Sequence, residues 1–342
     1  MTKILDPYGL GRVVSPKGSL PQAADVLDPS LPGRSDEMVI DVDHLNIDAA
    51  SFRQISTEAG GDPQRIAETI RRIVRERGKM HNPVTGSGGM LIGRVREMGE
   101  DHPARGVLHP GDRIATLVSL TLTPLALEEI LAVHPAIDRV DVRGHAILFA
   151  SGVWARLPDD MPETLALAAL DVCGAPALVD RYVEAGQTVL VLGAGKSGLL
   201  CCAMARDKGA RVIASDVSAQ AVETAISLGL ADEGLVADAT RPVEVLRAVR
   251  EHTSGRLCDV VVNCSNVPRT EMAAILSVRE RGRVIFFSTA TSFTAAALGA
   301  EGVGKDAELL IGNGYAQGHA ELTLDLLRRH ASLRRHFESR YA

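Results

Sequence analysis

Aromatic residues and cysteines are scarce in this sequence, and each scarcity limits what it encodes. Phe, Trp and Tyr make up 3% of the 342 residues, so the interior must be built mainly from Ala, Val, Leu and Ile. The five cysteines are an odd number, the first is Cys173, and no CxxC spacing occurs. A disulfide framework or a thiolate zinc site is therefore not expected. We predict a reducing compartment, the cytoplasm.

Excess positive charge and long apolar runs are also missing. The formal net charge is −6, whereas nucleic-acid-binding proteins carry a concentrated basic face. The arginines between residues 71 and 77 have the spacing of the solvated face of an amphipathic helix. The N-terminus lacks the apolar core of a signal peptide, and no run approaches the roughly 20 apolar residues of a membrane span. We therefore expect neither a nucleic-acid partner nor a membrane.

The sequence does contain a dinucleotide-binding fingerprint, in a segment that starts at Thr188. The residues Thr188–Leu192 (TVLVL) are typical of a buried strand, and the loop Gly193–Gly198 (GAGKSG) follows at once. An apolar helical segment, Leu199–Asp207, comes next, and a second strand, Arg211–Ser215, leads to an acid at position 216. A strand before the glycines and a helix after them is the context that this fingerprint requires.

Each part of the fingerprint has a physical role in binding a dinucleotide. Gly193 permits the tight turn, Gly195 allows backbone to approach the pyrophosphate, and Gly198 lets the helix pack on the strand. The helix N-terminus offers free N–H groups and a positive dipole to the phosphates. Asp216 is placed to bind both ribose hydroxyls of NAD and to repel the 2′-phosphate of NADP. We therefore predict NAD as the cofactor, with NADP less favoured.

The first half of the chain has a different pattern. Residues 1–36 form a segment rich in Pro and Gly, here called the arm, with one short strand expected at Arg12–Ser15. Short strands broken by glycines and prolines between residues 81 and 152 predict a compact antiparallel barrel. The other expected elements are a strand at Met38–Val42, a turn at Asp43–Asp48, helices at Ala49–Glu58, Pro63–Arg77 and Leu125–Leu131, and barrel strands at Gly89–Arg96, Arg113–Leu117, Arg139–Val142 and Gly144–Phe149.

Beyond Asp216, strands and helices alternate, which predicts a doubly wound parallel sheet. We expect helices at residues 219–228, 271–280 and 320–330, and strands at residues 234–236, 260–263, 284–287 and 308–311. We place an N-terminal substrate and catalytic domain at residues 1–160 and an NAD-binding domain at 161–318. Residues 319–342 are expected to form a segment that returns toward the catalytic domain.

This organisation resembles the medium-chain dehydrogenase/reductase superfamily from about residue 38 to the end. The turn His109–Ile114 (HPGDRI) matches the superfamily's GDRV turn, and Leu45–Asp48 (LNID) resembles a turn of its zinc-free quinone reductase branch. The resemblance implies an α/β fold, with a doubly wound parallel Rossmann sheet after a GroES-like antiparallel barrel domain. Zinc-dependent members carry Gly-His-Glu where this chain has Gly86-Ser87-Gly88, and their Cys ligand near Asn46 is absent. We therefore expect no metal.

The same resemblance extends the set of predicted cofactor contacts. Ser265 and Asn266 follow the fourth strand, where superfamily members contact the ribose, and Ser288 and Thr289 follow the fifth, near the nicotinamide. The sequence leaves open whether Lys196 contacts phosphate or points to solvent. Beside the three fingerprint glycines and Asp216, the predicted contacts are Ala194, Lys196, Ser197, Ser215, Asp238, Ser265, Asn266, Ser288 and Thr289.

The arm carries a more specific resemblance. Its segment Arg12–Gln22 (RVVSPKGSLPQ) resembles the opening of the L-erythro-3,5-diaminohexanoate dehydrogenase family, and Val84–Val95 and Val189–Gly198 fit the same family. The resemblance spans the whole chain. It implies NAD-dependent oxidative deamination of (3S,5S)-3,5-diaminohexanoate to 5-amino-3-oxohexanoate and ammonia, a reaction of lysine fermentation, by a homodimer or homotetramer.

The implied reaction sets requirements on the site. A neutral amine expels hydride with its own lone pair and the ammonium form cannot, so the site must supply a base. The second ammonium needs a carboxylate partner. Asp43, His44, Asn46 and Asp48 stand on one expected turn, where the superfamily meets the nicotinamide. His44 is the predicted base and Asp43 or Asp48 the ammonium partner. In the structural alternative, Asp43 caps the following helix and Asp48 binds backbone groups.

Further candidates and functions stay open. Thr85 and Ser87 stand where zinc-dependent members place ligands, so we predict that they face the substrate, unless they only make loop hydrogen bonds. Lys17 either binds the substrate carboxylate or is a solvated turn lysine. Another function on this scaffold is zinc-free reduction of quinones, enones or enoyl thioesters, although the acid-rich segment Asp43–Asp48 is unlike such mostly apolar sites. A non-catalytic nucleotide-binding relative is a third possibility.

Overall fold

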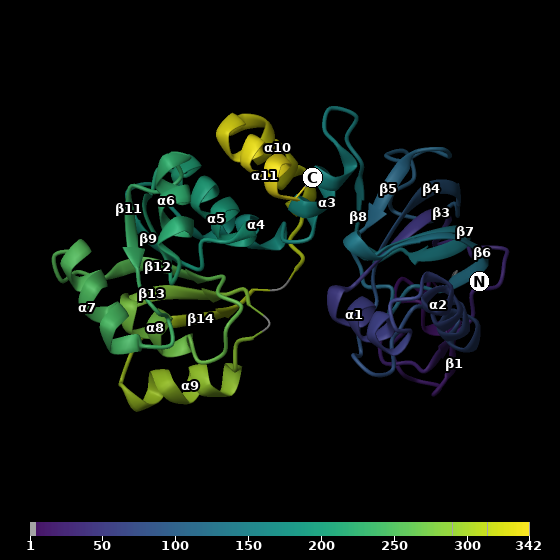
Figure 1. Ribbon diagram of the computed structural model, residues 1–342, viewed down its shortest axis with the longest axis horizontal. Helices are drawn as coiled ribbons and strands as arrows, with labels where there is room; N and C mark the ends of the chain where they lie inside the picture. Colours follow the sequence, from purple (N-terminus) through teal and green to yellow (C-terminus); the bar gives the residue numbers. More distant parts are fainter. Residues whose placement is uncertain (1–4, 289, 313, 342) are drawn as a thin grey trace. The chain divides into compact units, whose positions relative to one another are not determined.

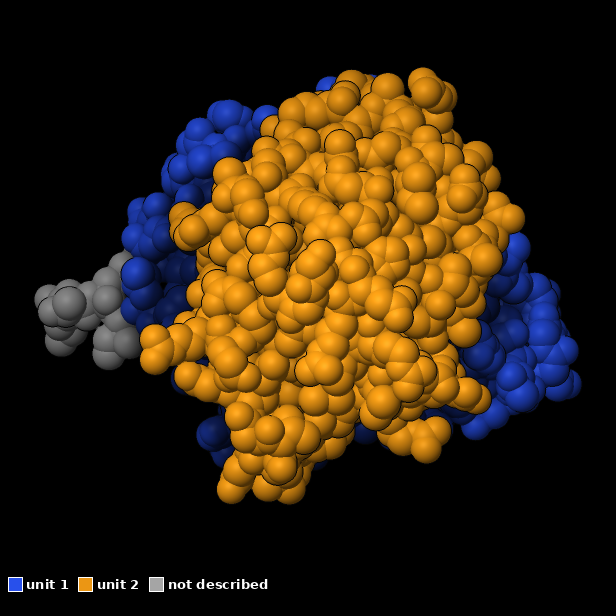
Figure 2. All heavy atoms as spheres, turned by 90° about the vertical axis from the view of Figure 1, so that its left-hand side faces the viewer, with its two compact units in different colours: residues 1–159 blue, residues 160–342 orange. Residues whose placement is uncertain are grey.

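The computed structural model of the chain describes residues 5–288, 290–312 and 314–341. Contacts divide the chain into two compact units, unit 1 (Met1–Asp159) and unit 2 (Asp160–Ala342), which are coloured separately in Figure 2. Each unit has its own six-stranded sheet and its own apolar core. Within the described residues, every helix is too short or too polar to span a bilayer.

Unit 1 is built on an antiparallel sheet with the strand order β6-β7-β3-β4-β5-β8 (Figure 1). Its central strand, β3 (Glu37–Ile47), pairs with β4 (Gly89–Met98) and β7 (Arg139–Phe149). The helix α2 (Pro63–Arg77) covers the core with an apolar face at helical spacing, as predicted. The other helices and strands of unit 1 that follow the arm are α1 (Ala49–Glu58), β5 (Arg113–Thr116), β6 (Leu125–His134), η2 (Pro135–Ile137) and β8 (Trp154–Arg156).

Three predictions in unit 1 were wrong, and tertiary pairing explains all three. Residues 43–47, expected in a turn, continue β3, because β4 and β7 hydrogen-bond to the strand on both sides up to Asn46. Leu125–Leu131, expected as a helix, lies in β6 and pairs with β7. The two short strands expected around Gly144 are one strand, since the missing side chain there admits the Ala126 carbonyl oxygen of β6. Pairing with neighbours overrides local propensity in sheets.

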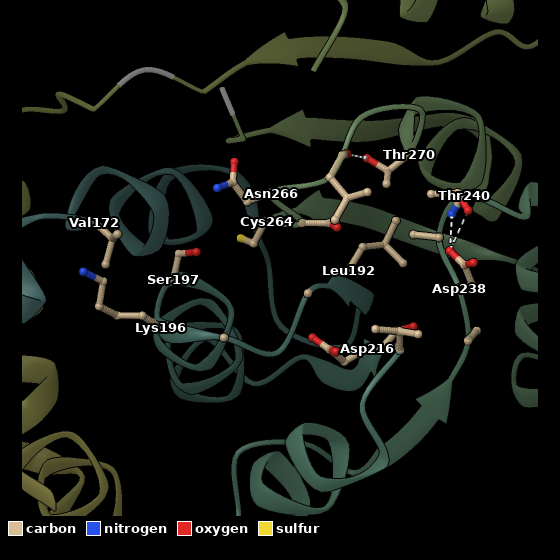
Figure 3. Close-up of a pocket in the computed structure, with 18 residues that line it drawn as sticks. Val172, Leu192, Lys196, Ser197, Asp216, Asp238, Thr240, Cys264, Asn266 and Thr270 are labelled. Carbon is tan, nitrogen blue, oxygen red and sulfur yellow. Dashed lines mark hydrogen bonds between the residues drawn. The ribbon is translucent and has the colours of Figure 1, made fainter. Parts of the chain in front are cut away.

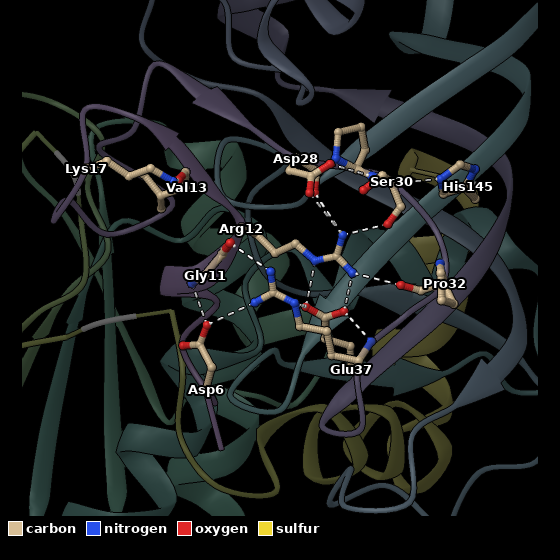
Figure 4. Close-up of polar contacts among 12 residues, drawn as sticks. Asp6, Gly11, Arg12, Val13, Lys17, Asp28, Ser30, Pro32, Glu37 and His145 are labelled. Atoms are coloured by element: carbon tan, nitrogen blue, oxygen red, sulfur yellow. Dashed lines mark hydrogen bonds and ion pairs between the residues drawn. The ribbon is translucent and has the colours of Figure 1, made fainter. Parts of the chain in front are cut away.

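The described part of the arm is anchored to strand β3 by a buried ion pair (Figure 4). Arg12 donates from Nε to Glu37 Oε1 at 2.9 Å and from Nη2 to Oε2 at 2.6 Å. It also donates from Nη1 to the Ser30 carbonyl oxygen at 2.6 Å. Such extra bonds are needed to offset the desolvation of a buried pair. The arm contains η1 (Leu10–Arg12) and the paired strands β1 (Val13–Ser15) and β2 (Val26–Leu27).

Unit 2 contains a parallel sheet with the strand order β11-β10-β9-β12-β13-β14. This is the doubly wound order, with the switch point between the first strand, β9, and the fourth, β12. The helices α4, α5 and α6 lie on one face, and α7, α8 and α9 on the other (Figure 1). The strands are β9 (Thr188–Leu192), β10 (Arg211–Asp216), β11 (Glu233–Val236), β12 (Cys258–Asn263), β13 (Val278–Phe286) and β14 (Glu308–Ile311).

The helices of unit 2 agree with the predicted alternation, with three differences. The sequence reasoning missed α7 and α9, and the helix expected to reach residue 280 ends at Ser277, where β13 begins. The last two helices pack within unit 2, against α3 and α4. The predicted domain boundaries and the separate segment 319–342 stay predictions. The helices are α3 (Glu163–Leu170), α4 (Gly174–Tyr182), α5 (Lys196–Asp207), α6 (Ala219–Ser227), α7 (Pro242–His252), α8 (Glu271–Ser277), α9 (Phe293–Gly302), α10 (His319–Arg329) and α11 (Ala331–Tyr341).

Candidate functional site

A cavity of about 450 Å³ lies in unit 2 at the carboxyl ends of β9, β10, β11 and β12 (Figure 3). Ligands of doubly wound sheets bind at this edge, at the switch point of the strand order. The predicted cofactor contacts that line the cavity are Gly193, Gly195, Lys196, Ser197, Ser215, Asp216, Asp238, Ser265 and Asn266. Chain segments that are far apart in sequence therefore meet around one space.

The three fingerprint glycines differ in what surrounds them. A Cβ on Gly198 would lie 1.8 Å from the Gly193 carbonyl oxygen, and one on Gly193 would lie 2.9 Å from the Ser265 nitrogen. Both glycines are therefore needed for packing inside the protein. Apart from its two chain neighbours, no described residue has an atom within 4 Å of a Cβ built on Gly195. The open side of Gly195 fits the expected approach of a pyrophosphate to the backbone.

The N-terminus of α5 is left uncapped by side chains. Its N-cap residue is Gly195, which has no side chain that could accept a hydrogen bond from the first turn. By contrast, the N-cap residues of α6 and α9 are Ser218 and Ser292, whose hydroxyl oxygens accept backbone N–H groups. The first N–H groups of α5 thus have no side-chain acceptor in the described part of the chain. Free donors and the positive end of a helix dipole suit a phosphate.

Two carboxylates stand at the ends of neighbouring strands. Asp216 Oδ2 accepts from the Ala194 backbone N–H at 2.8 Å, and its Oδ1 accepts from Ser218 at 2.9 Å. A carboxylate oxygen can accept more than one hydrogen bond, so the fixed Asp216 can still receive ribose hydroxyls. Asp238 accepts from the Thr240 hydroxyl at 2.7 Å and its backbone N–H at 2.9 Å, and these bonds lower the pKa of Asp238.

Three of the predicted cofactor residues, Lys196, Ser288 and Thr289, differ from the others in their surroundings or lie outside the described part. Lys196 Nζ forms an ion pair with Asp171 Oδ2 at 2.5 Å and lies 5.9 Å from the ring centre of Tyr341. Its amine is thus held by a carboxylate, an arrangement that the sequence reasoning did not consider. Ser288 is 9% exposed, accepts from a backbone N–H, and is not part of the cavity lining. Thr289 lies outside the described residues.

The sequence reasoning missed several lining residues. Cys264 directly follows β12, and Val217 directly follows β10. Thr240 lies four residues after β11 and fixes the neighbouring acid. Their signal is positional, since each follows the carboxyl end of a parallel strand near the switch point. Polarity alone would not have selected the cysteine or the valine.

In unit 1, Asp48, Thr85 and Ser87 come together with Ser51, which was not predicted. We call these four residues the hydroxyl cluster. Ser51 Oγ lies 2.5 Å from Thr85 Oγ1 and 2.7 Å from Ser87 Oγ. Ser87 Oγ donates to Asp48 Oδ1 at 3.0 Å. Asp48 is the N-cap of α1 and accepts from the backbone N–H groups of Ala50 and Ser51.

The other three predicted catalytic residues lie elsewhere on β3. His44 is 1% exposed, between Ile92 of β4 and Asp141 of β7 in the pairing register. Asp43 forms an ion pair with Arg113 at 3.4 Å. Asn46 is half-buried within the strand. The expectation that they share a turn with Asp48 was wrong. In the structural alternative, the cap at Asp43 was wrong, whereas the binding of backbone groups by Asp48 is confirmed. Their catalytic roles stay predictions.

Asp138 brings a further carboxyl group to this end of β3. Its carbonyl oxygen accepts from the Ile47 backbone N–H at 2.9 Å, which places it beside the residue before Asp48. Burial raises the pKa of Asp138; the charge of Arg53 opposes this rise, and the charge of Asp48 adds to it. The sequence reasoning missed Asp138, because the register of β3 with β7 brings it here from a distant segment.

In the described ranges, no three His, Cys, Asp or Glu side chains are gathered so that they could hold a metal ion. The predicted absence of a metal stays a prediction. The glycine loop, the uncapped helix and Asp216 all lie in unit 2, and the residues present there fit a nicotinamide dinucleotide.

Comparison with known proteins gives the family. Residues 11–158 match the family model of the L-erythro-3,5-diaminohexanoate dehydrogenase N-terminal domain, and residues 198–302 match a model described as zinc-binding dehydrogenase. The chain is 52% identical to the L-erythro-3,5-diaminohexanoate dehydrogenases of Acetoanaerobium sticklandii and Fusobacterium nucleatum, over 98% of this chain and 98% of each relative.

A solved structure confirms the fold. The alcohol dehydrogenase of Thermotoga maritima superposes with a TM-score of 0.56 at 19% identity, covering 90% of this chain and 85% of that one. At this identity the likeness concerns the fold alone, an α/β fold of the medium-chain dehydrogenase/reductase type. Because these two relatives are 52% identical to the chain over 98% of both lengths, the chain belongs to the L-erythro-3,5-diaminohexanoate dehydrogenase family.

Proposed function

We propose that the chain catalyses the oxidative deamination of (3S,5S)-3,5-diaminohexanoate to 5-amino-3-oxohexanoate and ammonia. The observation that carries this proposal is the 52% identity, over 98% of both chains, to two proteins named for that substrate. The aligned region takes in both units, and so both the cofactor cavity and the hydroxyl cluster. As an oxidoreductase of this superfamily, the protein uses a nicotinamide cofactor, which accepts the hydride from the carbon that bears the 3-amino group.

We propose NAD rather than NADP as that cofactor, because of Asp216. Two backbone N–H groups hold its carboxylate at the end of β10, beside the cavity. A fixed negative charge there favours ribose hydroxyls and repels a 2′-phosphate. In Asp216→Asn, an acceptor oxygen remains for the backbone while the charge is lost. The ratio of kcat/KM for NAD to that for NADP should fall at least about tenfold, as expected for a bond to a charged group. An unchanged ratio would contradict the assignment.

On the substrate side, we propose that Asp48 binds a substrate ammonium group. Asp48 is exposed, and in the described residues its hydrogen bonds all fall on Oδ1, so Oδ2 faces an incoming cation without competition. The Ser87 hydroxyl donates to that carboxylate and is itself in contact with the Thr85 hydroxyl, and both hydroxyl oxygens offer further acceptors for ammonium N–H groups. Charge-assisted bonds of this kind are the strong ones.

The other candidates keep their predicted roles, with less support. His44 stays the predicted base, Asp43 a predicted ammonium partner and Asn46 a predicted nicotinamide contact. The burial of His44 and the pairing of Asp43 with Arg113 favour Asp48 as the group that meets the substrate. Replacing His44 by Ala and comparing rates across pH tests the base assignment, since an unchanged profile rejects it.

The activity itself is tested by following product formation in buffer that contains a metal chelator. We expect NADH and ammonia in equal amounts with 3,5-diaminohexanoate, and no NADH with a simple alcohol. Absence of diamine turnover, together with NADPH-dependent reduction of an enone, would establish the alternative zinc-free reductase. Nucleotide binding without turnover of any of these substrates would establish the non-catalytic alternative.

We propose that the protein works in the cytoplasm as a homodimer or homotetramer, with β13, β14 and their neighbouring helices as the interface. The strand β14 lies at the edge of the parallel sheet, and its Ile311 is 64% exposed. Leu298 of α9 is 63% exposed. An exposed edge with apolar side chains is a typical surface for strand pairing between chains. Light scattering should show an oligomer that Ile311→Lys weakens; a monomeric wild type would exclude the proposal.

A further inference from the structure

Two cysteines from different elements lie side by side at the cofactor cavity. Cys201 Sγ, on α5, is 3.8 Å from Cys264 Sγ, in the loop after β12. All five cysteines of the chain lie in the described part, and four are buried. Cys264 is the exception, because it is half-buried and lines the cavity. One thiol of this pair is thus open to small molecules, and the other is enclosed behind it.

The pair sits at the turn that the cofactor is expected to use. The Cys264 backbone N–H donates to the Leu192 carbonyl oxygen at 2.8 Å, where β9 and β12 run side by side. A Cβ on Gly193 would lie 3.0 Å from the Cys264 carbonyl carbon. Cys201 belongs to the helix whose uncapped N-terminus follows the same glycine loop. A covalent bond between the two sulfurs would therefore tie α5 to the opposite wall of the cavity.

We propose that Cys264 and Cys201 form a reversible disulfide in the wall of the cofactor cavity, and that this disulfide and the bound nicotinamide cofactor oppose each other. A disulfide has an S–S length of about 2.0 Å, so the sulfurs must approach by about 1.8 Å from their 3.8 Å separation. Such a movement is within reach of side-chain rotation and a small shift of the loop after β12.

The oxidant is a peroxide, and the steps balance. The Cys264 sulfur attacks one oxygen of hydrogen peroxide, the O–O bond breaks, and water leaves, so that Cys264 becomes a sulfenic acid. The Cys201 sulfur then attacks the sulfenic sulfur, the S–O bond breaks, and a second water carries away the Cys201 proton. Two thiols lose two hydrogens in all, and one peroxide is reduced to two waters. A dithiol reductant reverses the oxidation.

Exposure decides which sulfur reacts first. Burial raises the pKa of the Cys201 thiol well above its ordinary value, so it is inert toward a reagent in solution. Cys201 reacts second, with the sulfenic acid that has formed on the neighbouring Cys264. Burial also raises the pKa values of Cys173 and Cys258 to about 12, so neither competes. Cys202, the neighbour of Cys201 on α5, is fully buried as well and serves as the matched control.

Binding and oxidation are coupled because they use the same wall. A cofactor in the cavity covers Cys264 and hinders the approach of peroxide. Conversely, a disulfide displaces the loop after β12 and restrains α5, whose first N–H groups are the expected phosphate donors. Thermodynamic linkage requires the two equilibrium effects to be equal in size. We therefore expect the disulfide to weaken NADH binding at least about fivefold, the lower end of common coupling between sites.

The experiment maps the oxidised bond in the full-length protein. After treatment with hydrogen peroxide and alkylation of the remaining thiols, tryptic digestion should link peptide 197–206 to peptide 257–269, and dithiothreitol should separate them. The variant Cys202→Ala should still form this link. The variant Cys201→Ala should not, and dimedone should then trap a sulfenic acid on Cys264. A link that survives in Cys201→Ala, or no link in the wild type, overturns the proposal.

The coupling is measured on the same samples. The linked protein should bind NADH at least about fivefold more weakly than the reduced protein, and saturating NADH should shift the thiol–disulfide equilibrium in a dithiothreitol redox buffer toward the thiols by the same factor. Equal NADH affinities of the linked and reduced proteins, with a thiol–disulfide equilibrium that NADH does not shift, overturn the coupling. The inference needs the cavity to bind a nicotinamide cofactor but not a diamine to be the substrate. Failure of diamine turnover therefore leaves these outcomes unchanged, and failure here leaves the proposed reaction unchanged.

Discussion

The cofactor cavity of unit 2 and the hydroxyl cluster of unit 1 are built from the same local unit, a strand followed by the N-terminus of a helix. At the β9–α5 junction no side chain of a described residue caps the helix, and the side of Gly195 is open. At the β3–α1 junction, Asp48 caps the helix, and three hydroxyls bond to one another or to this carboxylate. Open N–H groups suit an anion, whereas a capping carboxylate suits a cation. The capping residue decides which ligand such a junction can hold.

The largest effect is expected in the glycine loop. In Gly198→Ala, the new Cβ would meet the Gly193 carbonyl oxygen at 1.8 Å, so the loop must shift. Both the melting temperature and NADH affinity should fall, the affinity by about a hundredfold or more, since binding depends on loop geometry. The matched variant is Gly195→Ala, whose new Cβ has no atom of a described residue within 4 Å apart from those of its two chain neighbours.

The Gly195→Ala protein should melt within about 2 °C of the wild type, because no internal contact changes. Its NADH affinity should still fall about tenfold, since the added methyl group stands where the pyrophosphate approaches. Calorimetry and fluorescence titration measure the two quantities. Wild-type affinity in Gly195→Ala would show that the open space is not the phosphate position.

The next effect tests whether Asp48 does more than cap α1. Asparagine caps a helix about as well as aspartate, so Asp48→Asn should change the free energy of unfolding by less than about 0.5 kcal/mol. Loss of the charge should lower kcat/KM for the diamine at least about tenfold, as for a lost charge-assisted bond. Asp62→Asn is the control, because Asp62 caps α2 in the same way. Equal activity in both variants would reduce Asp48 to a structural cap.

Unit 1 also buries the amine of Lys79 beneath the arm. Lys79 is 0% exposed, and its Nζ donates to the Pro21 and Gln22 carbonyl oxygens at 2.8 and 3.3 Å. Burial, aided by the charge of Arg77, lowers the pKa of Lys79 from 10.5 to about 8. The unfolded chain therefore binds more protons between these two values, and the free energy of unfolding rises with pH across this window.

Between about pH 7.5 and pH 9.5, Lys79 should add on the order of 2 kcal/mol to the free energy of unfolding as its proton leaves. Lys79→Met removes this contribution, so urea unfolding of the variant should depend less on pH than that of the wild type. The difference between the two proteins isolates Lys79 from other titrating groups. An equal pH dependence of the unfolding free energy in the two proteins would mean that the hydrogen bonds to the Pro21 and Gln22 carbonyl oxygens offset the cost of burying the charged amine.

The smallest effect concerns Lys196. Its ion pair with Asp171 holds the amine away from a phosphate, and exposed pairs of this kind contribute little to stability. Lys196→Met should therefore change NADH affinity by less than about threefold, since no charged bond to the cofactor is lost. Isothermal titration calorimetry of both proteins with NADH measures this affinity. A tenfold weaker binding would show that the amine leaves Asp171 for the phosphate when the cofactor binds.

Prediction from sequence succeeded where neighbouring residues decide the structure. The strand Thr188–Leu192 and the helix Pro63–Arg77 have the bounds that their patterns predict. It failed where pairing between distant segments decides. Leu125–Leu131 consists of residues that favour a helix in isolation, yet β7 holds it as a strand. Residues 43–47 lie in β3 for the same reason.

The sequence by itself determined the nucleotide fold, the glycine loop with its acid at Asp216, and the family. These features depend on spacing along the chain, and backbone geometry converts such spacing directly into position. Only the tertiary structure decided that Ser51 lies against Thr85 and Ser87, that Lys196 pairs with Asp171, and that Cys201 lies beside Cys264. Such neighbours are set by strand register and by the packing of helices on the sheet, and no local pattern encodes either.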